Sequence, residues 1–187
     1  IGVLQAAIWN TSPNISVDDS NNQFKFTTSS APAGTYTFTI PDGLYSVEGL
    51  SNYLSSQFVN LTLPSNLITI SGNDSTGQSV VTFLVSGDSV DFTIANTPRL
   101  IMGFNSVVIT APSANYSFFS NNPAQFNQVN SYIISSNLVA NGIQVNANPQ
   151  GIIAAVPISV PPGSQINFSP QNVVWFSGNE LIGTMKA

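Results

Sequence analysis

The sequence predicts an all-β protein, folded as an antiparallel β-sandwich or jelly roll. Two observations carry this prediction. Apolar and polar residues alternate in short segments from one end of the chain to the other, and clusters of turn-forming residues separate these segments. Many short strands with turns between them are typical of sandwiches and jelly rolls.

The expected strands are the segments with period-two alternation. Tyr36, Phe38 and Ile40, for example, are separated by Thr37 and Thr39. The predicted strands lie around Phe24 and Phe26, around 36–40, and at 67–70, 80–85, 90–94, 107–110, 129–138, 151–156, 165–168 and 173–176. The turns between them contain Pro32-Ala33-Gly34, Pro41-Asp42-Gly43, Gly72-Asn73-Asp74, Ser86-Gly87-Asp88 and Pro161-Pro162-Gly163.

One segment has helical spacing. From Ser46 to Phe58 the apolar residues step by three, four and four positions, which predicts a short helix over about 46–58. Ser46 can cap the first turn, and Glu48 lies where the helix dipole favours an anion. We expect this helix to lie across one end or face of the sandwich.

A single domain over residues 1–187 is the simplest organisation. No internal repeat of fixed period is visible, and the segments on both sides of 111–128 share the same composition. That stretch, which contains Asn121-Asn122-Pro123, is expected to be a long loop and is the one plausible linker.

The low charge of the chain excludes several partners. Charged residues make up only 6 % of it, against roughly 25 % in an average soluble domain. Three cations, Lys25, Arg99 and Lys186, cannot neutralise a run of phosphates, so we expect no nucleic-acid binding. No apolar run approaches the length of a spanning helix, and no signal peptide is expected at the N-terminus. A surface of uncharged amides and hydroxyls instead favours contact with other protein chains.

Conventional catalysis is not expected. The chain has no His and no Cys, which excludes Ser-His-Asp and Cys-His arrangements and the common zinc sites. A Ser-Lys pair would have to use Lys25, which lies in a predicted strand, or Lys186 near the end of the chain. A carboxylate pair for glycoside hydrolysis could come from the eight acids, but none lies in a segment that marks it as special. We therefore predict no catalytic residue, no cofactor and no enzyme activity.

Two further kinds of site are compatible with the residues of the chain. The loop Asp18-Asp19-Ser20-Asn21-Asn22 gathers oxygen ligands that suit calcium, as do Asp88 and Asp91 on either side of Ser89-Val90. The simpler interpretation is that these residues form turns, so no metal site is predicted. Trp9, Trp175 and the tyrosines could form a sugar-stacking platform, but core packing is the favoured interpretation for both tryptophans.

Three blocks of the chain resemble a viral protein family. They are Val3 to Asn10 with Pro13-Asn14-Ile15 and Asn21 to Phe24; Thr39 to Val47; and Leu100 to Phe104 with Asn130 to Leu138 and the proline-glycine segment up to Pro170. In these blocks the chain is similar to the minor capsid, or penton, protein of Maverick/Polinton-type elements, adintoviruses and virophages. Each motif is degenerate, but together they touch most of the chain.

This resemblance implies a single jelly roll whose partners are further copies of itself and a major capsid protein. Five copies would form the ring at each icosahedral vertex, seated among trimers of a double jelly-roll major capsid protein. The location would be the capsid shell of the virion, and the family has no catalytic motif to transfer.

Other functions remain open from the sequence. Another capsid role, as a shell or cement protein, would use the same low-charge surface. A carbohydrate-binding or adhesive sandwich would require an exposed row of aromatic residues, and a carboxylate hydrolase would require a paired acid.

Overall fold

A computed structural model describes residues 1–126, 129–137, 143–145, 148–160 and 163–176, with side chains described outside 138–150. The chain divides into two compact units. Residues 12–128 form the first, here called the central unit. Residues 1–11 and 129–187 form the second, the terminal unit. That the two units act as one jelly-roll domain over 1–187 stays a prediction.

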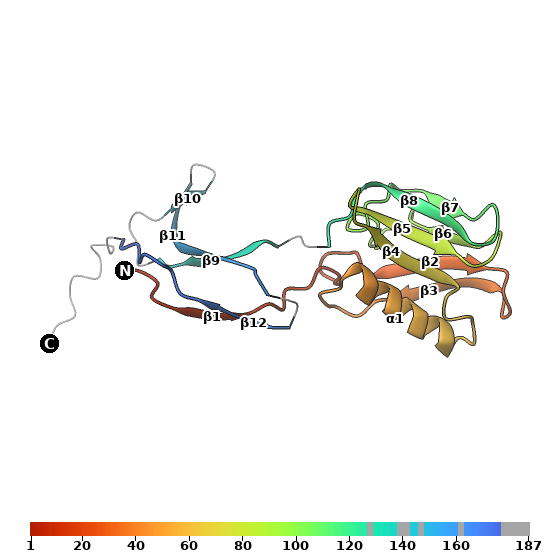
Figure 1. The fold of residues 1–187 in the computed structure, drawn as a ribbon, viewed down its shortest axis with the longest axis horizontal. Helices are drawn as coiled ribbons and strands as arrows, with labels where there is room; N and C mark the ends of the chain where they lie inside the picture. The colour runs from red at the N-terminus through yellow and green to blue at the C-terminus, as the bar shows by residue number, and fades with distance from the viewer. Residues whose placement is uncertain (127–128, 138–142, 146–147, 161–162, 177–187) are drawn as a thin grey trace. The chain divides into compact units, whose positions relative to one another are not determined.

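The central unit is a two-layer antiparallel sandwich with one helix (Figure 1). One sheet has the strand order β3-β2-β6-β7, and the other has the order β4-β5-β8. The strands are β2 (Gln23–Thr28), β3 (Gly34–Thr39), β6 (Ser89–Asp91) and β7 (Val108–Thr110), and then β4 (Ile68–Asn73), β5 (Gln78–Phe83) and β8 (Tyr116–Pro123). The predicted all-β sandwich with a single short helix is confirmed.

The helix α1 spans Val47–Asn60 and joins the two sheets along one side. Ser46 caps it as predicted, because its Oγ accepts a hydrogen bond from Gly49 N at 2.9 Å. The face at Leu50, Leu54 and Phe58 is buried. The helix touches both layers: its Phe58 ring packs edge-on against Phe26 of β2, and its Ser51 Oγ accepts from Ile70 N of β4.

The core of the central unit is apolar and aromatic. Phe26 lies at its centre, with ring centroids 5.1–5.3 Å from those of Tyr36, Phe38 and Phe58. Such offset and edge contacts add to the free energy gained by burying the rings. Asn14 ties the two ends of the unit together, since its Nδ2 donates to the carbonyls of Tyr45 and Phe126.

The terminal unit consists of two thin antiparallel sheets. Among the described residues, strand β1 (Ala6–Trp9) pairs only with β12 (Gln165–Phe168). Strand β11 (Asn148–Pro157) lies between β10 (Ile143–Val145) and β9 (Ser131–Ser135). Asn10 joins segments far apart in sequence, because its Nδ2 donates to the Val160 carbonyl and its Oδ1 accepts from Tyr132.

Three of the predicted segments need correction. The expected loop at 111–128 contains β8, an eight-residue strand; the adjacent Phe118 and Phe119 hide its alternation in the sequence. The predicted strand at 90–94 ends at Asp91, whose carboxylate accepts from Thr93 N and turns the chain. The segment 173–176 is not a strand, because only Phe176 exchanges backbone hydrogen bonds, with Ile1. Leu138, in the predicted strand 129–138, lies outside the described residues.

Candidate assembly surface

The cation of β2 is engaged in an ion pair. Lys25 Nζ lies 2.9 Å from Asp91 Oδ2 on the adjacent strand β6. The hydrogen bond from Lys25, with those from Thr93, lowers the pKa of Asp91 to about 2. The partner of Lys25 is thus a carboxylate and not a serine hydroxyl. Lys186 lies outside the described residues.

Asp88 is a fully buried carboxylate that holds the turn after β2 in place. It accepts hydrogen bonds from Thr28 Oγ1 at 2.9 Å, from Ser29 N at 3.0 Å and from Ser29 Oγ. A buried charge is tolerated where several donors satisfy it. The carboxylate oxygens of Asp88 and Asp91 therefore accept hydrogen bonds from other groups of the protein.

The Asp18–Asn22 loop is built as a turn. Asp19 Oδ2 accepts from Ser16 Oγ, Ser16 Oγ accepts from Asp19 N, and Asn21 Oδ1 accepts from Ser16 N. These contacts support the turn-former interpretation of the loop. Among the described residues there is no group of three or more His, Cys, Asp or Glu that could hold a metal ion. Independence from metal stays a prediction.

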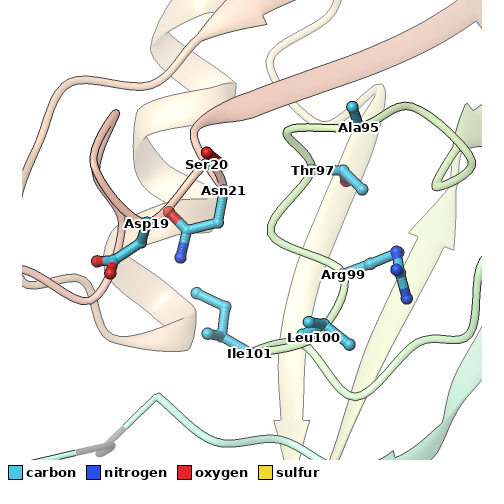
Figure 2. A pocket seen from close by; sticks show the side chains of 8 residues that line it. All are labelled: Asp19, Ser20, Asn21, Ala95, Thr97, Arg99, Leu100 and Ile101. Atoms are coloured by element: carbon cyan, nitrogen blue, oxygen red, sulfur yellow. The ribbon is translucent and has the colours of Figure 1, made fainter.

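A cavity of about 220 Å³ lies between this loop and the segment after β6 (Figure 2). Its lining residues are Asp19, Ser20, Asn21, Ala95, Thr97, Arg99, Leu100 and Ile101. The Thr97 hydroxyl is buried without a hydrogen-bond partner, so a water or a small polar molecule would satisfy it. In Figure 2 the guanidinium of Arg99 points away from Asp19, so the cavity does not present a charged pair to a ligand.

The largest exposed aromatic residues lie in the terminal unit. Trp9 is 58 % exposed and Trp175 is 67 % exposed, so the expectation that both pack in the core is wrong. For Trp9 the reason is that, among the described residues, no second layer covers the outer face of the β1-β12 sheet, while Trp175 lies in a segment outside the strands. On the β1-β12 sheet the exposed face carries Ala7, Trp9, Gln165 and Asn167, while Ala6, Ile8, Ile166 and Phe168 are at least partly buried.

The β9-β11 sheet shows the same pattern. Ile133 of β9 is 56 % exposed and lies opposite Ala155 of β11, which is also exposed. Tyr132 and Val156 pair on the other face, where Val156 is fully buried. Both sheets of the terminal unit thus display apolar side chains on faces that solvent reaches.

Charge is distributed very unevenly between the two units. Every charged side chain from residue 1 to residue 179 lies between Asp18 and Arg99, in the central unit. The described part of the terminal unit contains none. The sequence shows that these charges cluster between residues 18 and 99, which the count of charged residues does not reveal. Residues 100–128 of the central unit are uncharged as well, so charge alone does not mark the boundary between the units.

Comparison with family models, with curated proteins and with solved structures found no match. Within the described residues, no helix is long and apolar enough to cross a membrane. The candidate site therefore rests on the chain's own geometry: two uncharged sheets with exposed apolar faces, attached to a well-packed central unit.

Proposed function

We propose that this chain is a structural capsid protein, the penton subunit at the vertices of an icosahedral virus with a double jelly-roll shell. In this role five copies close a ring, and the ring contacts the major capsid protein. The proposal combines the resemblance of the three sequence blocks with the all-β sandwich and with the exposed faces of the terminal unit.

The exposed apolar surface of the terminal unit is the observation that supports the proposal most strongly. Among its described residues, only Ile152, Val156 and Ile166 are buried apolar side chains, whereas Leu4, Trp9, Ile133, Val174 and Trp175 are exposed. A two-stranded sheet is marginally stable at best in water. Exposed apolar surface of this kind is typical of a site that another protein covers. A capsid subunit has such neighbours on several sides.

The available side-chain chemistry supports a structural role. The chain has no His and no Cys. Lys25 and Asp91 pair with each other, and Asp88 accepts hydrogen bonds from the backbone and hydroxyls around it. These groups stabilise the central sandwich, and none of them is left over for general acid or base work. We accordingly propose that the protein is not an enzyme.

Imaging of native particles tests the proposed function directly. Particles purified from the natural source should contain the chain, and a reconstruction should place five copies around each five-fold axis. Each subunit contact should bury at least the roughly 1,200 Å² of a specific interface. A chain that is absent from particles, or that occupies the shell faces instead of the vertices, would contradict the penton role.

Carbohydrate binding is the second candidate, and the exposed tryptophans are the observation that favours it. Tryptophan rings stack well on sugar faces when they are accessible. Here, however, Trp175 lies beside Gly2, while Trp9 lies at the far end of β1. The two rings therefore do not form one row along the sheet. Quenching of tryptophan fluorescence by a panel of oligosaccharides, with no vertex location in particles, would favour this function.

A further inference from the structure

The cavity shown in Figure 2 has walls that the chain's own hydrogen bonds hold in place. On one side, Ser16 N donates to Asn21 Oδ1, and Asn21 Nδ2 donates to the Asn14 carbonyl. On the other side, Phe104 N donates to the Arg99 carbonyl at 2.8 Å and closes a turn. Small-molecule sites are usually formed before the ligand arrives, and this cavity of about 220 Å³ meets that description.

Thr97 brings an unused hydrogen-bonding group to the cavity. It lines the cavity and is 5 % exposed, and its Oγ1 has no hydrogen-bond partner within the described part of the chain. Leaving a buried hydroxyl unpaired destabilises the folded chain. A ligand atom that accepts from Thr97 would therefore gain a hydrogen bond that the protein itself does not make.

Arg99 brings a positive charge two residues further along. The other described side-chain cation, Lys25, is paired with Asp91, whereas no described residue forms an ion pair or hydrogen bond with the Arg99 guanidinium. In Figure 2 this guanidinium and the carboxylate of Asp19 point in opposite directions. Asp19 Oδ2 instead accepts from Ser16 Oγ. The charge of Arg99 is therefore not neutralised by the cavity's own lining.

The remaining lining limits the body of the ligand. Ala95, Leu100 and Ile101 give the cavity an apolar side. Its volume is below the roughly 300–1,000 Å³ of sites for drug-sized molecules, so the occupant is short. A guanidinium presents its donors in a fixed fork that matches the two oxygens of a carboxylate. Together these features favour a carboxylate on a short aliphatic chain.

We propose that this cavity binds such a carboxylate, whose oxygens accept from the Arg99 guanidinium and the Thr97 hydroxyl while the aliphatic part packs on Leu100 and Ile101. Two sources present the same chemistry: a small free acid, and an acidic side chain of another protein. The site lies in the central unit, and it does not depend on the proposed penton function.

Nuclear magnetic resonance of the full ¹⁵N-labelled chain tests the site with butyrate as the probe. Arg99 is the one arginine in the sequence, so its Nε–Hε signal needs no further assignment. Butyrate should shift this signal and the backbone amide signals of Asn21 and Ile101, with a dissociation constant on the order of 1 mM. Butyramide has the same shape but no charge, and it should bind at least about tenfold more weakly.

A matched pair of substitutions tests the charge through the Asn21 and Ile101 signals. Arg99→Gln should weaken butyrate binding about tenfold or more. Lys25→Gln is the control, because it changes the net charge by the same amount but removes a cation that is already paired with Asp91. It should leave butyrate binding unchanged. Circular dichroism at 222 nm checks that α1 is folded in each variant.

Two further substitutions test the other groups of the lining. Thr97→Val keeps the shape of the side chain and removes the hydroxyl, so it should weaken butyrate binding about tenfold. It should not lower the stability of the chain, because the lost hydroxyl has no partner in the described structure. Asp19→Asn should strengthen binding about twofold, since it removes a negative charge from the lining.

A capped glutamate, N-acetylglutamate N-methylamide, distinguishes the two sources. Tighter binding of this compound than of butyrate would assign the site to an acidic side chain of another protein, and equal or weaker binding would assign it to a small free acid. Three results would overturn the inference: no saturable shift with either compound, equal binding of butyramide, or undiminished binding by Arg99→Gln. All three leave the penton proposal intact, because that proposal does not use this cavity.

Discussion

The central unit and the terminal unit are built from similar types of polar and apolar residues but have very different interiors. In the central unit, 21 buried apolar residues form one cluster between two sheets and a helix. In the terminal unit, the described residues include three buried apolar side chains and none of the charges. Alternation of polar and apolar residues therefore indicates strands in both units, but it does not indicate whether a second layer covers them.

This difference separates two sources of stability. The free energy of the central unit comes from contacts within the chain, since about 25 cal/mol is gained for each Å² of apolar surface that it buries. The terminal unit gains less from its own contacts and, in the proposed penton role, gains the rest from neighbouring copies. Its stability should then depend on protein concentration, which is the signature of folding linked to association.

The two units should unfold separately, and this is the largest effect that we expect. Both tryptophans lie in the terminal unit, and α1 lies in the central unit, so fluorescence and the 222 nm signal report on different units. In a urea titration at low protein concentration, the fluorescence transition should come first. Raising the concentration should move that transition upward and leave the 222 nm midpoint unchanged. Coincident transitions at all concentrations would contradict the comparison.

Phe26→Ala should destabilise the central unit alone. The ring is fully buried among Tyr36, Phe38 and Phe58, so its removal leaves a cavity and should cost about 3–5 kcal/mol. The 222 nm midpoint in urea measures this loss. Tryptophan fluorescence should keep its wild-type midpoint, and an equal shift of both signals would show that the units are coupled.

Two glycines allow a matched test of backbone packing in the two units. A Cβ at Gly103, where φ is +77°, would collide with the Asn122 carbonyl oxygen, and a Cβ at Gly151 would collide with that of Ser136. Gly103→Ala should therefore lower the stability of the central unit by about 3 kcal/mol, which is large for a single substitution. Gly151→Ala should instead affect the fluorescence transition and the oligomers.

Gly72→Ala is the control for this pair, because a Cβ there would meet nothing within 4 Å and the residue has no positive φ. It should leave both transitions within about 0.5 kcal/mol of wild type, as surface substitutions usually do. A large loss of stability for Gly72→Ala would show that alanine disturbs the fold without any collision, which would contradict the collision as the cause in the other two variants.

Asp91→Asn should have the smallest effect, and it should depend on pH. Hydrogen bonds from Lys25 and Thr93 lower the pKa of Asp91 from its ordinary 3.8 to about 2, so folding favours the ionised carboxylate. The resulting stability is present above pH 4 and is lost as the pH falls toward 2. Because solvent partly screens the pair, we expect a cost of only about 1 kcal/mol at pH 7.

Thermal melts of the wild type and of Asp91→Asn across this pH range measure the effect through the 222 nm signal. The two proteins should differ at pH 7 and converge below pH 2.5. A difference that stays constant from pH 7 to pH 2 would show that the carboxylate contributes by packing and not by its charge.

Much of the fold was predictable because it depends on local patterns. The spacing of Leu50, Leu54 and Phe58 and the cap at Ser46 define α1 without reference to the rest of the chain. The alternation around Phe24 and Phe26 likewise defines β2. Strand β8 was missed because Phe118 and Phe119 are adjacent, and a bulge at Gln78 and Val80 of the partner strand accommodates the irregular pairing.

The sequence by itself determined the all-β class, the single helix, the low charge and the lack of His and Cys chemistry. The exposure of Trp9 and Trp175 was decided only by the tertiary structure, since burial depends on whether other parts of the chain pack over a residue and not on its neighbours in sequence. The same holds for Asp88, whose carboxylate is tolerated inside because Thr28 and Ser29 fold back to donate to it. Strand identity is local, whereas burial and hydrogen-bond satisfaction arise from residues distant in the chain.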